Sequence, residues 1–161
     1  MKKIIIFVFL CIALLSLNVY ADVSPAPDLK LPTADGSVQL SDLKGKVVYL
    51  DFWASWCVPC KKSFPWMNAM QQRYAAQGFE IVAVNLDKER ALADAFLKQI
   101  PESFTVAFDA SGSSAARYKL RGMPSSYLIG RDGKLHASHI GFREKDKDKL
   151  EQAIKNLLDR K

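Results

Sequence analysis

Two cysteines separated by two residues, Cys57 and Cys60, lie where an apolar run of the sequence gives way to a helical pattern. Residues 47–53 are almost continuously apolar, which is typical of a strand buried on both faces of a parallel or mixed sheet. From Cys60 onward the apolar residues recur at helical spacing, so we expect a helix to begin at or just after Cys57. A strand, a short turn and a helix in this order restrict the chain to folds that layer helices on a sheet.

The first 21 residues have the layout of a secretory signal peptide. A short basic head precedes an apolar run over residues 4–17, and Ala21 ends a small-residue cleavage pattern. This run is short for a membrane span, which takes about 20 residues. We therefore expect an exported, periplasmic protein whose single domain covers residues 22–161. The alternative is an N-terminal segment that is retained uncleaved as a membrane anchor.

The charge of the chain says little about partners. It carries 23 Lys and Arg against 17 Asp and Glu, a net charge of +6, and loss of Lys2 and Lys3 with the leader lowers this to +4. Such a charge on a chain that is 49% hydrophobic indicates a globular protein with a solvated basic surface and excludes a disordered one. We expect no nucleic-acid partner, and because no dimerisation segment is visible we expect a monomer.

Cysteine usage separates a reactive pair from a structural one. Cys11 lies in the leader, so the mature chain keeps only Cys57 and Cys60. A disulfide between them closes a loop of only a few residues, so it would contribute little to folding stability. In an oxidising compartment, such a close pair is suited to thiol–disulfide exchange. Zinc would need two further ligands, and His136 and His139 lie three apart on an expected strand, where they would point to opposite faces. We expect no metal site and both histidines at the surface or a sheet edge.

The remaining pattern alternates strands with helices. Asp35 and Gly36 mark the turn of an N-terminal hairpin, and Asp132 and Gly133 mark that of a second hairpin. Strands are expected over residues 47–53, 79–86, 105–108, 126–129 and 135–140, and helices over residues 57–77, 89–99, 113–120 and 145–158. This order predicts an α/β sandwich built on a mixed sheet.

The place of Cys57 at the start of a helix has a chemical consequence. The positive end of the helix dipole and the unpaired N–H groups favour the thiolate, so the pKa of Cys57 should fall below about 8.5. Cys60 lies one turn deeper on the same face, while Pro59 sits in the first turn, where a missing N–H costs little. The sequence thus predicts thiol–disulfide exchange, with attack by Cys57 and resolution of the mixed disulfide by Cys60.

Several motifs together resemble the thioredoxin family, and in particular its exported TlpA/ResA-like branch. Residues 51–61 (DFWASWCVPCK) look like the active-site strand and helix, and Pro65 falls where the family has a helix-kinking proline. Residues 122–129 (GMPSSYLI) resemble the loop that holds the family's cis-proline, and residues 87–108 resemble an insertion of the branch. The resemblance covers about residues 26–158. It implies a thioredoxin-like fold with a central mixed sheet flanked by helices, an N-terminal hairpin and an inserted helix–strand segment.

The resemblance implies a substrate-binding surface around the cysteines. Pro124 would follow a cis peptide bond, and the Met123 backbone would pair with a strand of the substrate. Trp56 would shield and support the active-site loop beside Pro59; the alternative for Trp56 is an ordinary place in the core. The substrates would be proteins that carry disulfides or dithiols.

The resemblance also implies that Asp51 is the buried acid beneath Cys60. Burial would raise the pKa of Asp51 and let it accept the Cys60 proton through water. The alternative, an edge aspartate in solvent, fits badly within an apolar strand. The branch commonly has a glutamate three residues after the second cysteine, where this chain has Ser63. Proton handling would then rest on Asp51 alone, which argues against a role in cytochrome maturation.

The direction of electron flow depends on what stabilises the Cys57 thiolate. Val58 and Pro59 supply no cation, and strong oxidants owe their potential to a stabilised reduced form, so a reductant is favoured over an oxidant. The resemblance implies a membrane thiol reductase as electron donor, and no nicotinamide or flavin fingerprint predicts a cofactor. A peroxiredoxin-like peroxidase, a metal-delivery protein or a binding module without catalysis could share this fold. The Pro-x-x-x-Thr-x-x pattern of peroxiredoxins, however, does not precede Cys57.

Overall fold

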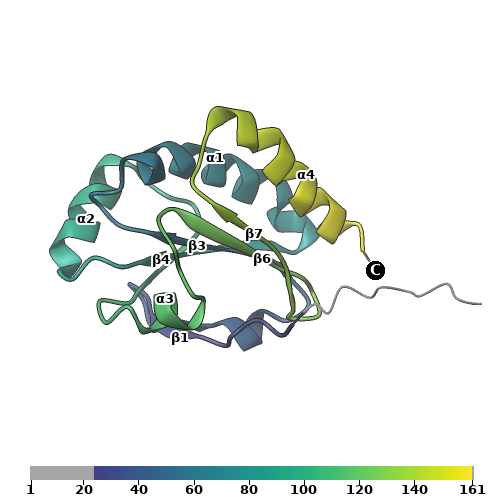
Figure 1. The fold of residues 1–161 in the computed structure, drawn as a ribbon, viewed down its shortest axis with the longest axis horizontal. Coiled ribbons are helices and arrows are strands. Elements are labelled where there is room, and N and C mark those ends of the chain that lie inside the picture. The colour runs from purple at the N-terminus through teal and green to yellow at the C-terminus, as the bar shows by residue number, and fades with distance from the viewer. Residues whose placement is uncertain (1–23, 161) are drawn as a thin grey trace, which may run out of the picture.

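A five-stranded mixed sheet lies at the centre of the structure, a computed structural model that describes residues 24–160 (Figure 1). The strand order is β5-β4-β3-β6-β7, with bounds Val47–Trp53 for β3, Phe79–Asn85 for β4, Thr105–Phe108 for β5, Ser125–Ile129 for β6 and Leu135–Ile140 for β7. β3, β4 and β5 are parallel, whereas β6 and β7 are antiparallel to their neighbours. The predicted α/β fold with a mixed sheet is confirmed. The expected leader, residues 1–21, lies outside the described residues.

Helices and a small hairpin cover the two faces of the sheet (Figure 1). Three helices pack on one face, namely α1 (Val58–Tyr74), α2 (Arg90–Gln99) and α4 (Lys147–Leu158). The other face is covered by β1 (Lys30–Pro32), β2 (Ser37–Gln39) and the short helix α3 (Ser113–Arg117). Three 3-10 turns lie at Leu40–Leu43, Ala75–Gln77 and Glu144–Asp146. The expected N-terminal hairpin is β1–β2, and the expected inserted segment is α2 with β5.

β3 is the central strand, and each of its residues is buried. Its side chains alternate between two cores: Val47, Tyr49 and Trp53 pack under α1, and residues 48, 50 and 52 pack toward β1. Burial on both faces explains why this stretch of sequence is apolar almost throughout. Asp51 is the one acidic residue in the strand. Burying a carboxyl group costs free energy unless hydrogen bonds or an opposite charge compensate for the lost water.

α1 begins at Val58, directly after Cys57, as the periodicity predicts. Pro59 lies in its first turn, and Pro65 lies inside the helix. After the following 3-10 turn, Gly78 adopts a left-handed backbone with φ of 80°, which any residue with a side chain would adopt only under strain. The helical segment, which is α1 followed by the 3-10 turn, therefore ends at the expected glycine, and the chain enters β4.

Three helices are shorter than their sequence patterns predict by two or more residues, and α1 is one of them, because it ends at Tyr74 before the 3-10 turn. α3 ends at Arg117, because Lys119 adopts a left-handed backbone with φ of 52° that an α-helix cannot continue. α4 begins at Lys147, because residues 144–146 form a tighter 3-10 turn before it. None of these changes moves a residue of the expected site.

The expected orientation of the two histidines is wrong, although both lie on β7, the edge strand, as expected. A bulge pairs Leu128 with Ala137 and Ile129 with Leu135, so His136 is left out of the register. A bulge interrupts the alternation of side chains. His136 and His139 consequently both reach residues that flank α4, where His136 meets Arg160 at 3.1 Å and His139 meets Asp146 at 3.5 Å.

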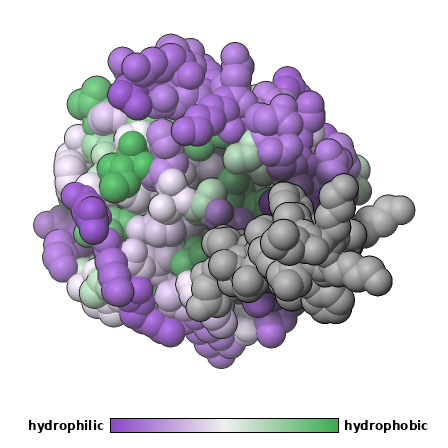
Figure 2. Space-filling view, turned by 45° about the vertical axis from the view of Figure 1, so that its right-hand side comes forward, coloured by the Kyte–Doolittle hydropathy of each residue, from purple (hydrophilic) through white to green (hydrophobic). Residues whose placement is uncertain are grey.

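The surface in view in Figure 2 carries mainly hydrophilic residues, with small apolar patches between them. Within residues 24–160, no helix combines the length and the apolar composition that crossing a membrane would require.

Candidate active site

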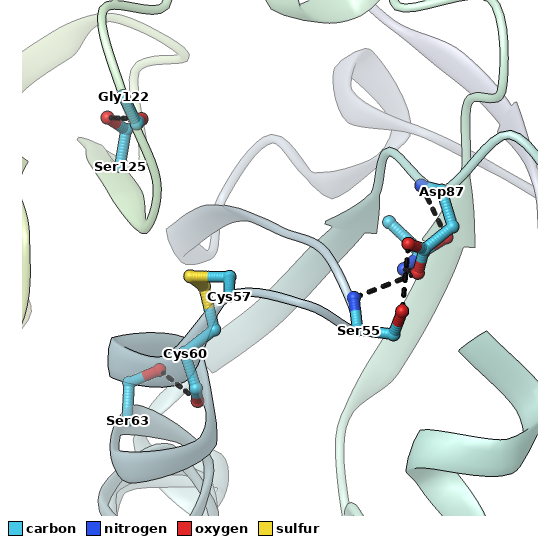
Figure 3. Close-up of a disulfide and its surroundings, with 8 residues drawn as sticks. Ser55, Cys57, Cys60, Ser63, Asp87, Gly122 and Ser125 are labelled. Carbon is cyan, nitrogen blue, oxygen red and sulfur yellow. Dashed lines mark hydrogen bonds between the residues drawn. A yellow bond between two sulfur atoms is a disulfide. The ribbon is translucent and has the colours of Figure 1, made fainter. Parts of the chain in front are cut away.

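Cys57 and Cys60 form a disulfide at the start of α1, with their Cα atoms 5.3 Å apart (Figure 3). Cys57 is the residue that caps the helix, and its carbonyl accepts the Cys60 N–H at 3.1 Å. The Cys57 residue is 4% exposed, whereas Cys60 is fully buried. Of the two cysteines only Cys57 has surface accessible to solvent, and the first-turn N–H groups of α1 face the Cys57 position.

Exposed apolar side chains surround the disulfide. Trp56 is 68% exposed and Val58 is 65% exposed, so the alternative of a core position for Trp56 is wrong. Pro59 is also exposed. At the end of β7 the exposed Ile140 lies beside Gly122, in the loop that leads into β6. Exposed large apolar residues gathered at one place are typical of a surface that binds another protein.

The loop before β6 lies across from the disulfide, where Figure 3 shows Gly122 and Ser125. The Met123–Pro124 peptide bond is cis, as the resemblance implied. Pro124 is buried and Met123 is half-buried against the core under α1. Two hydrogen bonds hold the loop: the Ser125 hydroxyl donates to the Gly122 carbonyl at 2.7 Å, and the Gly141 N–H donates to the Pro124 carbonyl at 2.8 Å.

Asp51 lies on the face of β3 that α1 covers, the same face as Tyr49 and Trp53 and the same core as Cys60. It is 2% exposed, so the alternative of a solvent-exposed edge aspartate is wrong. Its Oδ2 atom has no hydrogen-bond partner among the described residues. Burial in this environment raises the pKa of Asp51 well above its ordinary value, because the charged form is poorly solvated there.

Ser63 occupies the position at which the branch commonly has a glutamate. It is buried, and its hydroxyl donates to the Cys60 carbonyl at 2.9 Å (Figure 3). The hydroxyl is thus bonded to the helix's own backbone. Asp51 is a buried carboxyl group in β3, on the face of the strand that α1 covers.

A buried network that the sequence analysis missed holds the turn before Cys57 (Figure 3). The Asp87 carboxylate accepts the Ser55 N–H at 2.9 Å, the Ser55 hydroxyl at 3.0 Å and the Asn85 side-chain amide at 2.7 Å. Asp87 is 4% exposed. A signal for it did exist: Ser55 and Asp87 each follow a parallel strand by two residues, and the carboxyl ends of neighbouring parallel strands meet at one edge of a sheet.

Comparisons with known proteins agree over most of the chain. The model of the Redoxin family matches residues 22–154. The thiol-disulfide oxidoreductase ResA of Bacillus cereus is 36% identical over 133 residues, which cover 82% of this chain and 76% of that protein. ResA of Bacillus subtilis is 39% identical over 113 residues, which cover 70% of this chain and 63% of that protein.

Solved structures are also similar to most of the chain. A protein of Chlorobium tepidum described as a thiol:disulfide interchange protein DsbE is 55% identical with a TM-score of 0.83, covering 84% of this chain and 96% of that one. The exposed lipoprotein thioredoxin of Streptococcus pneumoniae is 33% identical with a TM-score of 0.71, covering 81% of this chain and all of that one (100%).

Proposed function

Because the chain belongs to the Redoxin family and is a thioredoxin-like thiol–disulfide oxidoreductase, we propose that it is an exported protein that reduces disulfides in protein substrates. Its ResA relatives confirm the TlpA/ResA-like branch that the motifs resemble. The observation that carries the proposal is the placement of the pair. Cys57 caps α1 at an apolar surface, and Cys60 lies fully buried in the core that also holds Asp51.

The reaction begins from the reduced pair. The Cys57 thiolate attacks one sulfur of the substrate disulfide, that S–S bond breaks, and the second substrate sulfur leaves and takes up a proton. Cys60 then gives its proton to Asp51 and attacks the Cys57 sulfur. The mixed disulfide breaks, and the substrate sulfur that Cys57 had attacked leaves as a thiolate and takes up a proton from solvent. Two electrons have passed to the substrate, and the Cys57–Cys60 disulfide seen in the structure is the oxidised product. A dithiol donor must return two electrons to complete the cycle.

Substrate recognition follows from the surface around the disulfide. Trp56, Val58 and Pro59 offer exposed apolar contacts on one side of Cys57, and Met123 and Pro124 form the loop on the other side. An apolar segment of a protein that carries a disulfide fits this surface. The chain is proposed to act as a monomer, with residues 1–21 directing export or anchoring it to the membrane.

The surroundings of Cys57 support reduction as the direction. Val58 and Pro59 lie between the cysteines and supply no positive charge, and a strong oxidant needs such stabilisation of its reduced form. A membrane thiol reductase is the proposed electron donor. After each turnover the Cys57–Cys60 pair must be reduced again, and in an oxidising compartment the electrons must come across the membrane. The pneumococcal neighbour, described as an exposed lipoprotein, supports export.

The reduction potential of the Cys57–Cys60 pair tests this proposal. The purified protein is equilibrated with a series of dithiothreitol or glutathione buffers, and the fraction of reduced pair is measured by thiol alkylation. A reductant is expected to have a potential of about −250 mV or lower. A value near about −120 mV would instead identify an oxidant that donates its disulfide, and the proposed direction would be wrong.

A further inference from the structure

A row of polar residues crosses the sheet from Asp51 to its edge. Asp51 on β3 pairs directly with Ser126 on β6, and Ser126 pairs directly with His139 on β7. Side chains of residues that pair directly across strands point to the same face of a sheet. This face is the one that α1 and α4 cover. The row therefore runs beneath the helices from the acid of the active site to the edge strand.

The end of the row at His139 has an unused nitrogen. The Nε2 atom of His139 is buried and makes no hydrogen bond among the described residues. The Asp146 carboxylate lies 3.5 Å from it, outside hydrogen-bond geometry, and is itself bonded to Arg143 at 2.7 Å. A cavity of about 100 Å³ opens beside the imidazole, and Tyr49 and Ser126 also line it. It has room for water between the polar groups.

The end of the row at Asp51 also has an unused atom. The Oδ2 atom of Asp51 has no hydrogen-bond partner among residues 24–160. Tyr49, two residues earlier on the same face, is buried, and burial together with the nearby Asp51 charge raises the pKa of its hydroxyl. A hydrogen bond with Ser126 acts in the opposite direction on that pKa. Tyr49, Ser126 and His139 thus line one cavity, and Asp51 is the direct strand partner of Ser126.

We propose that Asp51, Ser126 and His139 form a proton path between the buried acid and the solvent at the β7 edge. This inference rests on the proposed role of Asp51 as acceptor of the Cys60 proton. When a substrate covers the disulfide, the proton that Cys60 gives to Asp51 passes through Ser126 and cavity water to His139 Nε2, and then to solvent. No electrons move along the row, and the path returns a proton to Asp51 in the reverse reaction.

Charged groups lie around each end of the path. Asp146, at the start of α4, lies 3.5 Å from His139, and Lys149 on α4 lines the same cavity. The Arg143 guanidinium holds the pKa of Asp146 below its ordinary value, so that carboxylate stays ionised. On the Asp51 side, Tyr49 is the titratable neighbour on β3, and reduction adds the thiols of Cys57, which caps α1, and of Cys60 in its first turn.

The first test follows the His139 imidazole by NMR as pH is raised from about 5 to about 10, in the wild-type protein and in Asp51→Asn. Strands lie about 4.8 Å apart, so His139 is about 10 Å from Asp51 across two spacings. Charges at that distance still interact across a protein interior, so the ionisation of one group is expected to be visible in the titration of the other. We expect a second inflection in the His139 titration that Asp51→Asn removes. A single inflection that is the same in both proteins would overturn the proposal.

The second test measures the rate of substrate disulfide reduction against pH in His139→Gln and Ser126→Ala. Gln is similar in size to the imidazole and can form hydrogen bonds, but it does not titrate in this pH range. If His139 had only a structural role, His139→Gln would therefore keep the wild-type rate. We expect a loss of about tenfold, which is below the usual contribution of about 10²- to 10⁴-fold for a group that transfers a proton at the reacting centre. His136→Ala is the matched control, because His136 lies on the same strand outside the row and contacts Asp132 and Arg160.

Asp51→Asn in the same assay separates the two proposals. If Asp51→Asn is slow and His139→Gln is as fast as the wild type, the proton path is wrong and the role of Asp51 stands. If Asp51→Asn has the wild-type rate at every pH, the proposed role of Asp51 fails, and the path fails with it. Equal losses in His139→Gln and His136→Ala would also contradict the path, because only one of them belongs to the row.

Discussion

At the scale of single residues, the buried Asp51 shows that a side chain of the candidate site can lower the stability of the fold. Its carboxyl group is buried in the central strand, and burial raises its pKa well above the value in the unfolded chain. Between these two values the folded protein holds a proton that the unfolded chain has lost. Folding stability therefore falls as the pH rises from the unfolded pKa, near 3.8, through the folded one.

Asp51→Asn is expected to remove this loss of stability. The amide has nearly the same shape and does not titrate, so the variant should be more stable than the wild type at alkaline pH. The gain should be about 1.4 kcal/mol for each pH unit by which the folded pKa exceeds the unfolded one. Urea unfolding of the oxidised proteins at about pH 4 and about pH 9 measures it. A difference that does not grow with pH would show that Asp51 is not the buried acid that the structure describes.

At the scale of elements, the active site depends on how β3 and β4 end. The two strands are parallel, and the segments that follow them meet at the same edge of the sheet. Asp87, after β4, binds both the N–H and the hydroxyl of Ser55, in the turn between β3 and α1. A contact between segments 32 residues apart thus positions the cap of the cysteine helix.

Asp87→Ala is expected to loosen this turn. It leaves buried donors on Ser55 and Asn85 without their acceptor, which should lower the free energy of unfolding by about 2–4 kcal/mol. The rate of thiol exchange should fall as well, since Cys57 loses its support. Chemical unfolding and a disulfide-reduction assay check the two effects. Asp94→Ala is the control, because Asp94 makes an exposed ion pair with Arg90 on α2 and should matter little. Equal effects of the two variants would contradict the proposed support.

At the scale of the whole molecule, the inserted α2 is joined to the sheet through aromatic packing. Phe96 on α2 contacts Trp53 on β3 and Phe64 on α1, with ring centroids 4.7 Å and 5.0 Å away. These residues belong to the same core as the two cysteines. The insertion therefore contributes to the body that holds the disulfide, and its removal would open that core.

Phe96→Ala is expected to lower the free energy of unfolding by about 3–5 kcal/mol, because it leaves a cavity between α2, β3 and α1. Leu92→Ala on the same helix provides the comparison. Leu92 is 47% exposed, so its truncation should cost far less. Urea unfolding of both variants measures the difference. Similar losses for the two would mean that α2 is not joined to the sheet through Phe96.

Local sequence patterns were sufficient for most of the fold and for the chemistry of the pair. The apolar run of β3, the helical spacing after Cys60 and the glycine at position 78 are short-range signals, and the elements follow them closely. The same short range explains the errors. The early end of α3 depends on the backbone of Lys119, and the bulge at His136 depends on how β7 pairs with β6.

The sequence by itself determined that two closely spaced cysteines open a helix after a buried strand, because spacing and periodicity are properties of neighbouring residues. Only the tertiary structure decided which distant residues meet there. Asp87 reaches Ser55 because two parallel strands end together, and Asp51 shares a row with Ser126 and His139 because of strand register. Register and packing are settled between segments far apart in the chain, so no local pattern contains them.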